Sequence, residues 1–112
     1  MERNELEKMT SSYQALVEQL QALAIQKEQF AMQKNEQNEA MAEIEKATGK
    51  IYLNIGGVLV EMKKEDAVKK LKEKIESTEM RLTIATKQYD EYAKKEKELR
   101  EKINEALKAE KA

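Results

Sequence analysis

Residues 50–62 read KIYLNIGGVLVEM, and they interrupt two long stretches of helical sequence. Apolar side chains recur at every second position in both halves of this segment, which is the spacing of a β-strand. The Gly56-Gly57 pair between the halves suits a two-residue type I′ turn, because both central residues of that turn have positive φ. The segment therefore predicts a β-hairpin over residues 50–62.

The sequence before the hairpin carries a heptad pattern, in which mainly apolar residues recur in alternating steps of three and four. Such residues form one stripe along an α-helix and pack against a partner helix in a coiled coil. We expect a helix over residues 3–48, ended by Gly49 in the left-handed conformation that glycine adopts readily. The stripe consists of Leu6, Met9, Tyr13, Leu16, Leu20, Leu23, Lys27, Phe30, Lys34, Gln37, Met41 and Ile44.

The sequence after the hairpin carries the same pattern without a break, and it predicts a second helix over residues 64–110. Glu65 and Asp66 lie in the expected first turn, where the helix dipole favours negative charge. The second stripe consists of Val68, Leu71, Ile75, Thr78, Leu82, Ala85, Tyr89, Tyr92, Glu96, Leu99, Ile103 and Ala106.

If the chain folds back at its turn, the two stripes face each other, with Ile44 against Val68 and Met9 against Ile103. Every a position then meets a d position, as an antiparallel pair requires. The composition of 40% hydrophobic, 4% aromatic and 38% charged residues fits a thin seam with a wet surface. The predicted fold is mostly α: a long antiparallel two-helix coiled coil with one β-hairpin at the connection, in a single domain over residues 1–112.

The hairpin poses a problem of its own, because an isolated two-stranded sheet is marginal in water and has two free edges. The hairpin could fold onto its own helices, or hairpins of several chains could join into an intersubunit β-barrel. We expect assembly, because the surface of two helices is too small to cover both faces of the strands. The oligomerisation residues would be Ile51, Tyr52, Leu53, Ile55, Val58, Leu59, Val60 and Met62.

Charge and composition argue against several classes of function. The formal net charge is −1, from 21 basic and 22 acidic residues, whereas nucleic-acid binding usually needs a basic face. We therefore do not expect a nucleic acid as a partner. We do not expect a membrane either, because no apolar run approaches the length of a bilayer span. Histidine and cysteine are absent, and the carboxylates fall on exposed helix faces. We therefore expect no enzyme, no metal, no cofactor and an intracellular location.

The hairpin and the start of the second helix, IYLNIGGVLVEM followed by KKEDAVKKLKEKIES, resemble the β-class subunits of prefoldin. Family members carry a similar VYK-x-x-G-x-x-LVK hairpin and a similar helix start, and one hairpin between the helices is the β-class arrangement. Asn54 and Glu61 depart from the family, in which lysine is frequent at both positions. An archaeal subunit and a eukaryotic β-type paralogue both fit the sequence.

The resemblance implies an ATP-independent chaperone, a holdase, in a cytoplasmic hexamer of two α-class and four β-class subunits. Their hairpins would build a double β-barrel, and the coiled-coil tips would hold unfolded client proteins for a group II chaperonin. An alternative is a structural coiled-coil adaptor that binds one folded partner.

The tips of such a subunit are formed by its two ends, so the client-binding candidates are inferred from position. Ordinary seam packing is the competing interpretation for most of them, whereas Leu107 lies off the stripe and is the better functional candidate. Methionine suits a promiscuous surface because its side chain is flexible. The candidates are Leu6, Met9, Tyr13, Leu99, Ile103 and Leu107.

Overall fold

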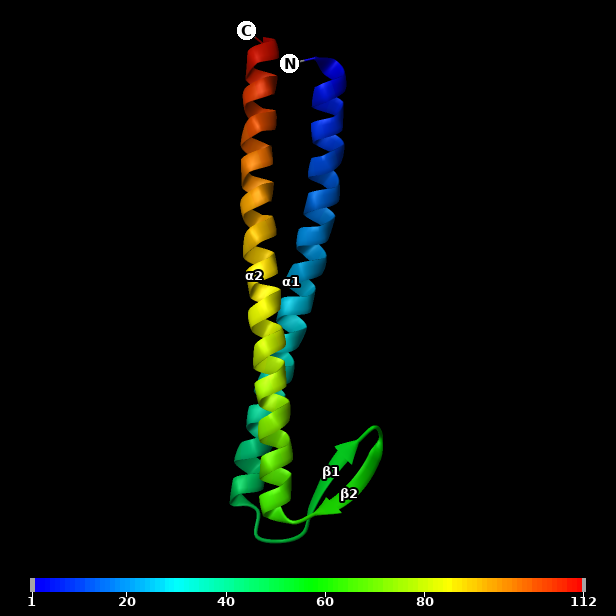
Figure 1. Cartoon of the computed structure of the whole chain (residues 1–112), viewed down its shortest axis with the longest axis vertical. Coiled ribbons are helices and arrows are strands. Elements are labelled where there is room, and N and C mark those ends of the chain that lie inside the picture. Colours follow the sequence, from blue (N-terminus) through cyan, green and yellow to red (C-terminus); the bar gives the residue numbers. More distant parts are fainter. Residues whose placement is uncertain (1, 112) are drawn as a thin grey trace. The chain divides into compact units, whose positions relative to one another are not determined.

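The computed structural model describes residues 2–111 and contains two helices and one two-stranded antiparallel sheet (Figure 1). Their order is α1 (Arg3–Lys46), β1 (Ile51–Ile55), β2 (Val58–Met62) and α2 (Lys64–Lys111). The predicted fold class of two long helices with one hairpin is confirmed. The helix bounds differ slightly from those expected, since α1 ends two residues before position 48 and α2 runs one residue past position 110.

The chain divides into two compact units, which are described separately. The terminal unit comprises Met1–Lys27 and Ile84–Ala112, and the hairpin unit comprises Glu28–Thr83. In each unit, a segment of α1 lies beside a segment of α2, and the two run antiparallel (Figure 1).

The stripe predicted from the heptads forms the seam between the helix segments within each unit. Every residue of both predicted stripes is buried or half-buried, and most of the intervening helix positions are exposed. The chain contains no proline, so nothing in the sequence interrupts the backbone hydrogen bonds of either helix. The 3.5-residue spacing therefore specifies which face of each helix is covered.

The end of α1 differs from the prediction. Gly49 does not have positive φ, and α1 has already ended at Lys46, so the expected left-handed glycine cap is wrong. Instead, the Ala47 N–H donates to the Ile44 carbonyl at 3.1 Å. The Lys64 ammonium at the start of α2 then donates to the carbonyls of Glu45 at 2.7 Å and of Ala47 at 3.3 Å. A lysine from the next helix thus satisfies the last carbonyls of α1, and its charge complements the negative end of the helix dipole.

The core of the hairpin unit lies where the strands meet the helices. Ile51 of β1 is 7% exposed and packs with Ile44 of α1 and with Ala67 and Leu71 of α2. Further partly buried residues pack against this group: Met41, Ala47, Leu53, Met62, Val68 and Ile75. The helix-proximal end of the hairpin is therefore anchored on the chain's own helices.

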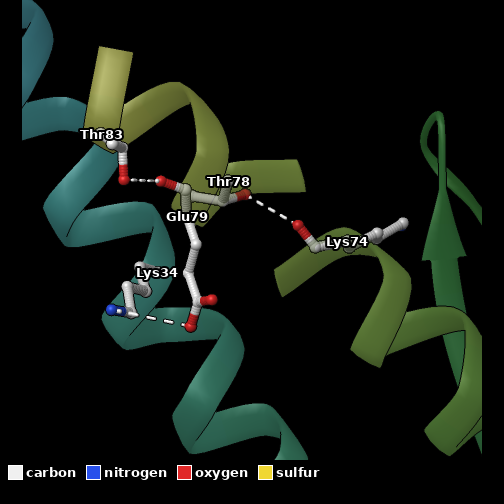
Figure 2. Close-up of polar contacts among 5 residues, drawn as sticks. All are labelled: Lys34, Lys74, Thr78, Glu79 and Thr83. Atoms are coloured by element: carbon white, nitrogen blue, oxygen red, sulfur yellow. Dashed lines mark hydrogen bonds and ion pairs between the residues drawn. The ribbon is translucent and has the colours of Figure 1, made fainter. Parts of the chain in front are cut away.

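Three polar residues of the seam lie in the hairpin unit. Thr78 is buried and donates its hydroxyl to the Lys74 carbonyl one turn earlier, at 3.0 Å. The Lys34 ammonium lies 3.7 Å from the Glu79 carboxylate. Figure 2 shows this ion pair between the two helices; the alkyl stem of Lys34 thus crosses the seam, and its charge reaches a partner at the edge. Among the described residues, the buried Oε1 of Gln37 accepts no hydrogen bond. This part of the seam is thus weaker than an apolar seam of the same length.

The hairpin turn has the predicted geometry. Gly56 and Gly57 have φ of +58° and +87°, which are the positive values of a type I′ turn. The Gly57 N–H donates to the Asn54 side-chain oxygen at 3.0 Å and closes the turn from the side. The strand register pairs Ile55 with Val58 and continues to Ile51 with Met62.

Replacement of Gly56 by valine should open the turn, because a β-branched residue at φ +58° costs about 1–2 kcal/mol. No atom lies within 4 Å of the position that a Cβ would occupy, so the whole cost is conformational. We expect amide hydrogen exchange at Ile55 and Val58 to accelerate about 5- to 30-fold. Gly56→Asn is the matched control, since asparagine adopts this conformation readily. Equal acceleration in both variants would contradict a left-handed first turn residue.

Candidate assembly and client-binding surfaces

The two faces of the hairpin differ in chemistry. Directly paired residues of an antiparallel sheet share a face, so the observed register places all of the apolar alternating positions together. The other face, which we call the mixed face, carries Tyr52, Asn54, Leu59 and Glu61. The apolar face consists of Ile51, Leu53, Ile55, Val58, Val60 and Met62.

The apolar face is covered at one end only. Ile51 is buried in the helical core, and Leu53 and Met62 pack against that core. Toward the turn the cover ends, and Val58 is 62% and Val60 37% exposed. The interpretation that the hairpin folds onto its own helices therefore holds for one end of it, whereas the other end presents apolar side chains to solvent and assembly there stays a prediction.

The mixed face and the strand edges add to this exposed surface. Leu59 is 69% and Tyr52 52% exposed. An ion pair of 3.8 Å between Lys50 and Glu61 lies beside them. Because the sheet has only two strands, each strand has one edge whose backbone groups face no other strand among the described residues. Such edges readily pair with another strand.

The predicted client-binding residues all lie in the terminal unit, but most of them face the seam. Leu6, Met9, Tyr13, Leu99 and Ile103 are half-buried. Nearby Ala106 is only 8% exposed, so the helices remain in contact close to their ends. Leu107 is 41% exposed, as expected for its position off the stripe. The structure brings these residues to one end of the seam, and their role in binding stays a prediction.

One side-chain interaction within this group was not predicted. The Tyr13 hydroxyl donates to Oε1 of Glu96 at 2.8 Å, across the seam of the terminal unit. The Arg100 Nε lies 3.6 Å from the same carboxylate oxygen, and the Glu96 side chain is only 17% exposed. A seam carboxylate is thus held by one neutral donor and one cation.

Farther from the ends, the terminal unit contains a second polar seam position. The Lys27 ammonium lies 4.9 Å from the centroid of the Tyr89 ring, which is within range of a cation–π interaction. The aromatic ring thus gives this seam lysine a partner without a carboxylate.

Two surface depressions of the terminal unit were also missed by sequence reasoning. One, of about 640 Å³, lies beside the predicted client-binding residue Leu6. The other, of about 300 Å³, has an entirely uncharged lining. Neither follows a single periodicity, because each combines seam and flank positions of two helices. The first is lined by Arg3, Leu6, Glu7, Thr10, Ser11, Gln14 and Glu110, and the second by Gln19, Ala22, Leu23, Gln26, Gln88 and Tyr92.

Some large apolar side chains outside the seam are exposed as well, namely Ile25, Met32, Met80 and Ile84. Neither described helix is long and apolar enough to cross a membrane. The residues that the structure describes contain no group of three or more acidic side chains placed to hold a metal ion.

Comparison with known proteins accounts for this combination of seam and hairpin. A family model described as prefoldin subunit matches residues 7–110. The chain belongs to the prefoldin family. The prefoldin subunit beta of Pyrococcus furiosus is 36% identical over 105 residues, covering 92% of this chain and 90% of that protein. That of Thermococcus gammatolerans is 39% identical over 106 residues, covering 93% and 91%.

A solved structure agrees with this assignment. The crystal structure of the prefoldin beta subunit from Thermococcus strain KS-1 matches with a TM-score of 0.84 and 32% identity, covering 92% of each chain. The resemblance stated from the hairpin sequence is therefore confirmed, and with it the prediction of a prefoldin-type chaperone subunit. Prefoldin subunits form complexes with other prefoldin subunits, and the family acts by binding rather than by enzymatic catalysis.

The hydrogen bond to Glu96 raises the pKa of Tyr13 above its usual value of 10.0, and burial and the Glu96 charge raise it further, while Arg100 lowers it. Since the pKa is higher in the folded chain, this stabilisation is complete below pH 10 and is lost as the pH rises through the folded-state pKa. In an ultraviolet titration, Tyr13→Phe should remove a tyrosine whose pKa lies above the usual value, and Glu96→Gln should lower the pKa of Tyr13 toward that value. Tyr52→Phe, at an exposed site, is the control; loss of an ordinary step in Tyr13→Phe would contradict the assignment.

Proposed function

We propose that the chain is one subunit of a cytoplasmic prefoldin hexamer that holds unfolded proteins without ATP and passes them to a group II chaperonin. The hexamer would combine α-class subunits with further β-class subunits, and residues 1–112 would act as one prefoldin-like domain. The observation that carries the proposal is the hairpin of a prefoldin-family chain whose apolar face is exposed toward the turn, at Val58 and Val60.

Assembly through the hairpin would remove two costs at once. A neighbouring strand would pair the unpaired backbone groups at each edge, which otherwise remain exposed. Closure of several hairpins into a barrel would also bury the apolar face, including Val58 and Val60. Burial of a valine side chain contributes about 1.5 kcal/mol or more, so repetition over several subunits is a substantial driving force.

Client binding at the free ends is supported by the kinds of residues gathered there. Terminal turns are the least stable part of a helix pair, and separation of the ends would expose Leu6, Met9, Leu99 and Ile103. Leu107 is already 41% exposed and can contact a client before any separation. Several small apolar contacts of this kind suit weak, reversible binding of many unfolded sequences.

The assembled protein should delay the aggregation of a chemically unfolded protein when no ATP is present. We expect light scattering from diluted, guanidinium-unfolded lysozyme to fall severalfold at a stoichiometric amount of the complex, because apolar client segments are covered. Native lysozyme of equal concentration should not bind. An unchanged scattering curve would refute the holdase proposal and favour an adaptor that recognises one folded partner.

Val58→Lys should lower the oligomeric state without loss of helicity. A lysine on the apolar face would have to be buried in the assembly, at a cost of several kcal/mol, so association should weaken at least roughly a hundredfold. Val60→Asp should act in the same direction. Met80→Lys, at a helix position that is 67% exposed, is the matched control and should assemble normally.

Native mass spectrometry and circular dichroism together report the result of this substitution. Smaller species with unchanged helicity are expected. A parallel loss of helix in Val58→Lys, or intact assembly, would argue against a barrel built from the hairpins.

A further inference from the structure

The hydrogen bond between Tyr13 and Glu96 occupies an unusual place in the seam. Both residues belong to the predicted stripes, so both side chains point toward the partner helix segment. The donor–acceptor distance is 2.8 Å, and the Glu96 side chain is 17% exposed. A carboxylate largely removed from water needs hydrogen-bond partners. Tyr13 supplies one, and Arg100 approaches the same oxygen at 3.6 Å.

This polar contact divides the apolar seam of the terminal unit. On the side toward the chain ends, the seam consists of Leu6, Met9, Leu99, Ile103 and Ala106. These five are half-buried or buried, so a client can reach them fully only when the two helix ends separate.

Separation at this point is cheaper than at an apolar layer. When the ends part, the Glu96 carboxylate regains its water, which offsets much of the lost hydrogen bond. A leucine at the same position would instead lose its whole burial. In the closed state, however, the directional bond between hydroxyl and carboxylate specifies one register, as single polar positions do in other coiled coils.

We propose that the Tyr13–Glu96 hydrogen bond is a clasp that holds the helix ends in register at rest and lets them separate to expose their seam residues to an unfolded polypeptide. The proposal rests on the proposed client-binding function of these ends. Tyr13 and Glu96 act as positioning residues: their contact sets how often Leu6, Met9, Leu99 and Ile103 become accessible. Leu107 makes contact in either state because it is already exposed.

Two substitutions move the clasp in opposite directions. Tyr13→Phe keeps the ring in the seam but leaves Glu96 without its hydroxyl donor, so the closed state is weakened. Glu96→Leu converts the layer to an apolar one, so the closed state is strengthened. In the Glu96→Leu background, Tyr13→Phe should have little further effect, because the hydroxyl no longer has a partner to lose.

Amide hydrogen exchange of the full chain, assembled with its partner subunits, tests the clasp directly. Tyr13→Phe should accelerate exchange over residues 3–12 and 97–111 by about tenfold, and Glu96→Leu should slow it by a similar factor. Tyr89→Phe is the matched control, since it removes a seam hydroxyl from the same unit and keeps the ring that Lys27 contacts.

Client affinity distinguishes the clasp from a purely structural contact. If the contact were purely structural, the less stable variant would not bind the client more tightly. Apparent affinity scales with the fraction of binding-competent ends, so Tyr13→Phe should bind unfolded lysozyme about tenfold more tightly although its seam is less stable. Glu96→Leu should bind more weakly although it is more stable. Two results would overturn the clasp: a client affinity that decreases when the seam is less stable, or amide hydrogen exchange at the helix ends that is unchanged in both variants. Loss of client binding in the unmodified protein would instead refute the proposed function, while the exchange result would still stand.

Discussion

Burial of Ile51 against Ile44, Ala67 and Leu71 is the contact on which the rest of the structure depends. Two heptad helices alone could pair in many ways, including with other chains. This contact ties the first residue of β1 to the last seam turn of α1 and to the first seam turn of α2. It therefore makes the two helices neighbours within the hairpin unit and fixes which face of the hairpin lies against them.

The same anchor explains why the hairpin is left incomplete. Strands of five residues extend past the small core at the helix ends, so the cover on the apolar face ends before the turn. Val58 and Val60 remain exposed because residues 2–111 contain no further helix or strand that could cover them. A single chain thus covers the seam of its helices but not the whole apolar face of its sheet, which is why we propose that the sheet associates with other subunits.

Polar residues modify the seam in a different way. Thr78 and Gln37 weaken the seam of the hairpin unit, and Glu96 weakens that of the terminal unit, yet each leaves the 3.5-residue spacing unbroken. Glu96 and Tyr13 satisfy each other across the seam, whereas the Gln37 side-chain oxygen remains without a partner among the described residues. Specific pairing of this kind matters most where helices have to open and close again in one register.

Local patterns were enough to predict much of this architecture. The heptad spacing predicted both seams, because burial on a helix follows directly from its period. The Gly56-Gly57 turn was predicted because a two-residue type I′ turn needs positive φ at both central residues, and glycine adopts positive φ readily. The cap of α1 was not, since Lys64 lies 17 and 19 residues from the carbonyls it contacts.

Other features depend on packing between distant parts of the sequence. The Tyr13–Glu96 bond joins residues 83 positions apart. The heptads place both residues in the seam, but they do not show which side chains reach each other. The division of the hairpin into a covered and an exposed end likewise depends on how far the helical core extends beneath it. The hydrophobic period and the secondary-structure propensities of the sequence do not show how far the helical core extends.

Thiol reactivity at the exposed end of the apolar face tests most directly whether assembly covers it. The sequence contains no cysteine, so Val58→Cys introduces a single thiol. Its reaction with a small maleimide should be at least about tenfold slower in the assembled complex than in the dissociated chain, because a buried thiol can react only through local opening. Met80→Cys, on a helix, should react equally fast in both. A thiol at position 58 that reacts as fast in the complex as in the dissociated chain would contradict assembly through the hairpin.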